Sequence, residues 1–255
     1  MQPKDILLAP IYLYQGNKIK RSTVRLPEAT GERQGQVLLH NDSEINGTSD
    51  LSPLTVMVVG DSSAAGVGVE TQNDALMGHF LKALPSQAAV QQKFAQIDWQ
   101  LHATTGHTSF DALRRLYVLP KPAAPVDIIV FIVGVNDTTS NISEQRWQSQ
   151  LNEIITIAKR KFAAKQIIFS CLPPMSHMPA IPAPLNEFIG AKADKLDKRL
   201  QRVCRESDCH YLSVDFKKAG FDADKMFAID GFHPNAAAYE YWGEQLAKQI
   251  GELVA

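Results

Sequence analysis

The sequence is poor in cysteine, and this scarcity excludes some classes of protein. It contains three cysteines, Cys171, Cys204 and Cys209, and no CxxC pair or Cys/His pair at zinc spacing. A disulfide framework and a structural zinc site are therefore not expected, although Cys204 and Cys209 could pair if the loop between them allows. Reduced, intracellular thiols are the expectation.

Long apolar runs and an excess of one charge are also missing. No stretch approaches the roughly 20 apolar residues of a membrane-spanning helix. The apolar segment near the start is interrupted by Pro10 and followed by no clear cleavage site, so we expect it in the folded protein and expect a cytoplasmic location. The net charge of -1 gives no reason to expect nucleic acid as a partner. Only residues 18–25 are strongly basic, which favours a solvated face over a patch for an anionic surface.

The remaining composition is that of a globular protein, with 45% hydrophobic and 21% charged residues. Short β-branched runs predict five buried strands, at residues 54–59, 98–103, 128–133, 167–171 and 211–214. Segments with helical spacing of apolar residues lie between and after them, at residues 75–84, 151–158, 196–203 and 239–250. This alternation predicts an α/β fold whose parallel sheet is covered on both faces.

Two segments fall outside the alternation. Residues 1–53 form an extension without clear periodicity, largely loop from residue 31 onward, which we expect to pack on a domain of residues 54–255. Residues 173–184 contain five prolines and can continue neither a helix nor a central strand. This loop is interpreted either as a rigid connector or as a wall of a substrate pocket.

Polar residues follow four of the five predicted strands. Ser62 follows the first strand, Gly106 the second and Asn136 the third, while Asp230 and His233 precede the last helix. Ligands of open parallel sheets bind beyond the carboxyl ends of the strands, so these residues are expected to meet there.

Together these residues match acyl transfer. Ser62 needs a base to become a nucleophile, His233 can take its proton, and Asp230 can orient the imidazole. The backbone N–H groups of Ser62 and Gly106 and the side-chain amide of Asn136 can stabilise an oxyanion. The stretch VVGDSSAAGVG could instead cradle a phosphate, but no Lys-Ser or Lys-Thr follows it and GxGxxG is absent.

Four blocks carry a resemblance to a known family: GDS at residues 60–62, Gly106, GVND at 134–137 and DGFHP at 230–234. In this order they resemble the SGNH hydrolase superfamily, the GDSL esterases and lipases, over roughly residues 54–250. Ser63 replaces the usual leucine, and the segment is similar to a GDSTAAGVG-like variant of bacterial members. The second block also lacks an additional glycine that some members carry.

The resemblance implies Ser62 as nucleophile, His233 as base, Asp230 as its partner, and an oxyanion hole from Ser62, Gly106 and Asn136. It also implies a flavodoxin-like three-layer α/β/α sandwich with a five-stranded parallel sheet, no cofactor and no metal. Carboxylic esters are the implied substrates.

Because no long apolar lid segment is evident, we predict a serine esterase for short acyl chains, with no transmembrane segment. The alternatives are an acetyl-sugar esterase, a thioesterase or lysophospholipase of the same fold, and a non-catalytic flavodoxin-like protein that binds phosphate or nucleotide. The oligomeric state is left open.

Other polar residues near the predicted site are assigned structural roles. Asp61 and Asp137 are expected to accept backbone N–H groups. His107 and His177 are interpreted as ordinary loop residues rather than pocket residues.

Overall fold

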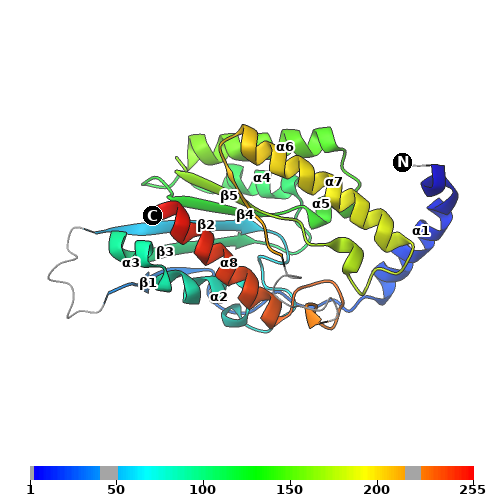
Figure 1. The fold of residues 1–255 in the computed structure, drawn as a ribbon, viewed down its shortest axis with the longest axis horizontal. Coiled ribbons are helices and arrows are strands. Elements are labelled where there is room, and N and C mark those ends of the chain that lie inside the picture. The colour runs from blue at the N-terminus through cyan, green and yellow to red at the C-terminus, as the bar shows by residue number, and fades with distance from the viewer. Residues whose placement is uncertain (1–2, 41–50, 216–224) are drawn as a thin grey trace.

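A computed structural model describes residues 3–40, 51–215 and 225–255 of the chain. Its centre is a six-stranded sheet in the order β1-β3-β2-β4-β5-β6 (Figure 1). The strands are β1 Gln34–Leu38, β2 Ser52–Gly60, β3 Phe94–Ala103, β4 Ile128–Ile132, β5 Gln166–Ser170 and β6 His210–Leu212. The five predicted strands correspond to β2–β6, which are mutually parallel.

The prediction of five strands was wrong by one. Strand β1 pairs antiparallel with β3 at the edge of the sheet, within a segment predicted to be largely loop. Its residues QGQVL are mostly exposed, so the strand shows no alternation of buried and exposed apolar side chains. Pairing with β3, rather than local pattern, makes this segment a strand.

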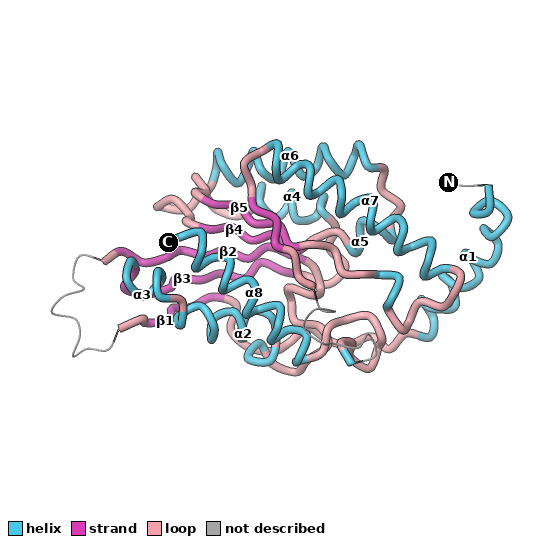
Figure 2. Tube along the Cα trace, in the orientation of Figure 1, coloured by secondary structure: helices cyan, strands magenta, loops and turns pink. Residues whose placement is uncertain are grey.

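Helices cover both faces of the sheet (Figures 1 and 2). The α-helices are α1 Pro3–Ser22, α2 Leu76–Ala83, α3 Ala88–Lys93, α4 Ser109–Val118, α5 Val135–Thr139, α6 Glu144–Lys161, α7 Leu185–Glu206 and α8 Ala236–Val254. Short 3-10 helices are formed by Gln72–Asp74, Leu84–Ser86 and Met175–His177. Among the described residues, no helix is long and apolar enough to cross a membrane.

Each face of the sheet has its own hydrophobic core. On one face, α4, α6 and α7 bury Leu116, Trp147 and Leu200 against the sheet. On the other, α2 and α8 bury Phe80 and Trp242. Strand β4 is buried along its whole length because both of its faces are covered, as its unbroken run of apolar residues predicts.

Helix α1 is a further departure from the predictions, since no helix was predicted within residues 1–53, and Pro10 lies inside it. The helix packs on α7, where the Tyr12 ring stacks on the Phe188 ring with centroids 4.6 Å apart. This contact stabilises a helix that the local sequence does not favour, because proline removes a backbone hydrogen bond.

Candidate active site

Three segments that carry predicted site residues meet at the carboxyl ends of the parallel strands. Strand β2 lies between β3 and β4, and Gly60 at its end is level with Ala103 of β3 and Ile132 of β4. The segments that follow these three strands carry Ser62, Gly106 and Asn136, and Asn136 lies within α5. The chain order reverses at β2, which is the place where open parallel sheets bind ligands.

Ser62, His233 and Asp230 form one connected chain of hydrogen bonds. The Oγ atom of Ser62 lies 2.9 Å from Nε2 of His233, across 171 residues of sequence. The other ring nitrogen, Nδ1, lies 2.5 Å from Oδ2 of Asp230. A carboxylate on Nδ1 fixes the tautomer that leaves Nε2 free to accept the proton of Ser62.

Asp230 is held as an anion by its surroundings. Burial raises its pKa, but hydrogen bonds from the His233 side chain and from the N–H groups of Phe232 and His233 outweigh burial and leave the pKa below its usual value. Those N–H groups lie 2.9 and 3.1 Å from Oδ1. The turn before α8 therefore orients the carboxylate toward the imidazole through backbone contacts.

The proline-rich loop 173–184 borders this turn. The N–H of Ala180 donates to the carbonyl of Gly231, 3.2 Å away, while Met178 and Ile181 are buried in the core. The loop is therefore packed into the core and supports the Asp230 turn through this contact. His177 within it is exposed and hydrogen-bonds to Ser176, as expected of a polar loop residue.

The turn after β2 uses most of its own N–H groups. Those of Ala65, Gly66 and Val67 donate to carbonyls of the same turn, and that of Ser63 donates to Oδ1 of Asp61. These groups cannot cradle a phosphate. Gly68 serves packing instead, because a Cβ there would collide with the carbonyl of Pro234, next to the turn that carries Asp230 and His233.

Donors for an oxyanion remain at the site. In the described part of the chain, the N–H groups of Ser62 and Gly106 have no protein acceptor. Gly106 has φ +83°, which favours glycine, and a Cβ there would point into open space. Asn136 donates one N–H of its side-chain amide to the carbonyl of His107, 2.9 Å away. Its amide carries a second N–H that can bind the oxyanion.

Asp61 and Asp137 are buried and accept hydrogen bonds, as expected from the sequence. Burial, opposed by the N–H of Ser63, raises the pKa of Asp61 to about 7. Burial also raises the pKa of Asp137, although Ser109 donates to it from both its N–H and its hydroxyl. These bonds fix the turn after β2 and join the start of α4 to α5.

Sequence reasoning missed Glu28 and Arg33, which brace the loop that carries Gly106. The carboxylate of Glu28 accepts the N–H and the hydroxyl of Thr105 at 2.6 and 2.8 Å. Arg33 pairs with Glu28 at 2.7 Å and donates to the carbonyl of Ala103 at 2.7 Å. Burial raises the pKa of Glu28, but the bonds from Thr105 and Arg33 outweigh it and lower the pKa.

The segment around Ala29 holds the turn that carries Ser62 in the same way. The N–H of Ala29 donates to the carbonyl of Ala65 at 3.2 Å. The buried side-chain amide of Gln72 donates to the carbonyls of Ala29 and Ala65. No local pattern predicts the contacts of Ala29, because Gln72, for example, lies 43 residues away in the chain.

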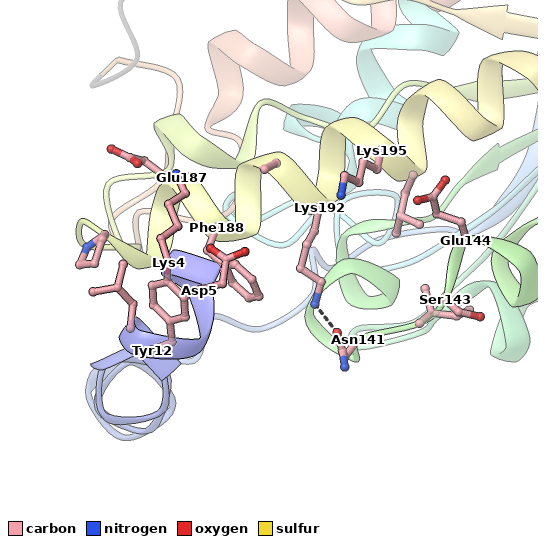
Figure 3. A pocket seen from close by; sticks show the side chains of 15 residues that line it. Lys4, Asp5, Tyr12, Asn141, Ser143, Glu144, Glu187, Phe188, Lys192 and Lys195 are labelled. Carbon is pink, nitrogen blue, oxygen red and sulfur yellow. Dashed lines mark hydrogen bonds between the residues drawn. The ribbon is translucent and has the colours of Figure 1, made fainter. Parts of the chain in front are cut away.

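A separate pocket of about 620 Å³ lies between α1, α7 and residues 141–144 (Figure 3). Lys192 spans it and donates to Asn141 at 2.6 Å. None of the five predicted site residues lines it. Within the described ranges, no group of three or more His, Cys, Asp or Glu residues could hold a metal ion, and all three cysteines are free.

Comparisons with known proteins agree with this architecture. The GDSL-like Lipase/Acylhydrolase family matches residues 58–241. The structure is similar to the psychrotrophic esterase EstA from Pseudoalteromonas sp., with a TM-score of 0.60 and 18% identity over 78% of this chain and 98% of that one. It is also similar to a lipase/acylhydrolase from Enterococcus faecalis, with a TM-score of 0.58 and 20% identity over 78% of this chain and 96% of that one.

A third similar structure is the acetylxylan esterase Axe2 from Geobacillus stearothermophilus. Its TM-score is 0.58 and its identity 15%, over 79% of this chain and 95% of that one. At such identities these structures support the fold alone. The sequence matches no curated protein significantly.

Proposed function

The chain belongs to the GDSL-like lipase/acylhydrolase family of ester hydrolases, and from this premise we propose that it is a serine esterase whose nucleophile is Ser62. One observation carries the proposal: the hydrogen-bonded series Ser62 Oγ, His233 and Asp230, with distances of 2.9 and 2.5 Å. A phosphate-binding protein would have no need of this series.

The first half of the proposed reaction acylates Ser62. Its Oγ attacks the ester carbonyl while Nε2 of His233 takes the hydroxyl proton. Asp230 keeps the imidazole in the right tautomer and stabilises the imidazolium that forms. The same imidazolium then returns the proton to the departing alcohol, which leaves an acyl group on Ser62.

The charge that develops on the carbonyl oxygen is stabilised by donors already in place. We assign the N–H groups of Ser62 and Gly106 and the side-chain amide of Asn136 to this role. Asn136 is held by its bond to the carbonyl of His107, so one amide N–H fixes the side chain and the other faces the oxyanion. Loss of one such donor typically costs about 10²–10³ in kcat.

The second half of the reaction is hydrolysis of the acyl-enzyme. His233 removes a proton from a water molecule, which attacks the acyl carbonyl, and the proton then passes to Ser62 Oγ. The same donors stabilise the second oxyanion. No step in this sequence requires a cofactor.

We further propose short acyl chains as substrates and a flavodoxin-like three-layer architecture. The parallel strands run in the order β3-β2-β4-β5-β6, which is the flavodoxin order 2-1-3-4-5 when only these five are counted.

The Geobacillus protein similar to this chain is an acetylxylan esterase. Acetylated sugars therefore belong in a substrate panel, beside aryl esters of rising acyl length, an acyl-CoA and a lysophospholipid.

The nucleophile is tested with a fluorophosphonate probe and a short p-nitrophenyl ester. Ser62→Ala is expected to lose both labelling and turnover, because the attacking oxygen is gone. Ser63→Ala is the matched control, since it removes the neighbouring hydroxyl and leaves the N–H bound to Asp61. Labelling that persists in Ser62→Ala, or that disappears in Ser63→Ala, would overturn the assignment.

A further inference from the structure

Helix α1 has one face on the protein and one face in solvent. Its inward face contacts α7 and the loop before it, through the stacking of Tyr12 on Phe188 and a 2.7 Å bond from the Gln15 amide to the carbonyl of Ala183. Figure 3 shows Asp5 and Tyr12 on this inward side, beside Phe188. These contacts fix which side chains of α1 face outward.

The outward face of the first half of α1 is apolar. Large apolar side chains there are exposed to solvent: Ile6 by 65%, Leu7 by 82%, Ile11 by 45%, Leu13 by 70% and Tyr14 by 68%. A single exposed leucine is ordinary, but a continuous group of five on one helix marks an interaction surface. This outward group also explains why the sequence of α1 shows no clear helical periodicity.

The second half of the same helix is basic. Lys18, Lys20 and Arg21, with Arg25 just beyond the helix, are all exposed, and residues 18–25 contain no acid. Binding of a helix to a bilayer interface grows with the apolar area that it buries and with the attraction of its cations to anionic lipids, and α1 offers both in successive halves. The apolar side chains enter the boundary below the headgroups, and the cations bind lipid phosphates.

The position of α1 relates this surface to the candidate active site. The helix lies at the end of the molecule toward which the parallel strands run (Figure 1). Two other exposed apolar side chains follow the same edge: Phe110 at the start of α4, and Ile229, 87% exposed and adjacent to Asp230. The remaining large ones include Tyr117 and Val118, at the far end of α4.

We propose that α1 docks this protein on an anionic phospholipid surface, through the apolar face of residues 6–14 and the cations of residues 18–25. The positive charge of residues 18–25 favours an anionic lipid surface over a second copy of the chain. A second copy would bring the same cations to the contact, and like charges repel. Docking turns the edge that carries Ser62 toward the bilayer.

Cosedimentation with vesicles tests the proposal, and vesicles of ether-linked lipids contain no ester to hydrolyse. The result is therefore independent of whether Ser62 acts as proposed. The full chain is expected to bind vesicles of ether-linked phosphatidylcholine and phosphatidylglycerol at least tenfold more tightly than phosphatidylcholine alone. High salt should remove this preference, because it screens exposed charges.

Two variants and two controls locate the surface. Leu7→Glu, and Lys20→Glu combined with Arg21→Glu, are each expected to weaken anionic binding at least tenfold. Val118→Glu and Lys121→Glu place a glutamate at an exposed apolar and an exposed basic position near the end of α4, and each should bind as the native chain does. All four should keep the native melting temperature; if Leu7→Glu does not, Leu13→Ser takes its place.

Three outcomes would overturn the proposal. The first is equal binding to neutral and anionic vesicles, and the second is equal loss in the controls. The third is absence of vesicle binding; a dimer, measured by light scattering, that Leu7→Glu dissociates would then assign the apolar face to a second copy of the chain.

Discussion

At the scale of single residues, the environment of each carboxylate separates its role from that of the others. Asp230 accepts hydrogen bonds from the His233 side chain and from two backbone N–H groups, and its pKa lies below the usual value despite burial. Asp61 is fully buried with fewer donors, and burial raises its pKa to about 7. The sequence places each aspartate within three residues of Ser62 or His233, and their contacts show the physical difference between them.

Replacing Asp230 with Asn is expected to lower kcat by about 10³–10⁴-fold while the protein stays folded. The Asn oxygen can still accept the N–H groups of Phe232 and His233, but its amide would donate to Nδ1 and place the imidazole proton on Nε2. The ring could then no longer take the proton of Ser62. Steady-state kinetics on a short aryl ester measure the effect, and a loss below tenfold would contradict the role given to Asp230.

Replacing Asp61 with Asn is expected to remove a pH-dependent loss of stability. The folded-state pKa of Asp61, about 7, lies above its usual value of 3.8, so the folded protein retains a proton that the unfolded chain releases. The free energy of unfolding of the native chain should therefore fall, relative to Asp61→Asn, as pH rises from 3.8 to about 7.

The difference should reach a few kcal/mol and change little above that range. Asn keeps an oxygen that can accept the N–H of Ser63, so the turn is preserved. Urea denaturation at several pH values measures the difference. Parallel pH curves for the two proteins would show that Asp61 has an ordinary pKa.

At the scale of elements, the segment between α1 and β1 supports the site. Glu28 and Arg33 bind the loop after β3, Ala29 binds the turn after β2, and β1 pairs with β3. These contacts give the predicted N-terminal extension a role that its sequence does not show. The helices and strands of the sheet were predictable because each carries its own apolar pattern, whereas this segment has none.

Replacing Glu28 with Ala is expected to lower kcat about 10–100-fold and to change KM little. The reason is that Thr105 would lose both of its bonds to Glu28, and small displacements of catalytic groups cost this much. Glu32→Ala is the matched control, since Glu32 is an exposed glutamate of the same segment. Glu28→Gln, which keeps an acceptor oxygen, should restore part of the rate.

An equal loss of kcat in Glu32→Ala, or a change confined to KM, would argue against a positioning role for Glu28. A native melting temperature in Glu28→Ala would show that the loss of rate does not come from unfolding.

At the scale of the whole molecule, one core buries the thiols of Cys204 and Cys209, and the other packs against the half-buried Cys171. Burial raises the pKa of Cys171 and of Cys209 to about 11, and that of Cys204 to about 12. Thiols with such values carry almost no thiolate at neutral pH, and the thiolate is the reactive form. The rate at which a thiol reagent modifies these cysteines therefore measures how much of the protein is unfolded around them.

A thiol reagent is accordingly expected to modify none of the three cysteines in the native protein at neutral pH. In denaturant all three should react, and the fraction that reacts should follow loss of the helical circular dichroism signal. Rapid modification of one cysteine under native conditions would show that its part of the core opens independently.

The sequence by itself determined the parallel sheet, the order of the strand ends and the identity of the candidate site residues. It could do so because buried strands need runs of apolar residues, and acyl transfer needs particular side chains at strand ends. Tertiary structure alone decided the sixth strand, the helix through Pro10 and the bracing by Glu28. Each of these depends on a partner distant in sequence, and a local pattern carries no information about such a partner.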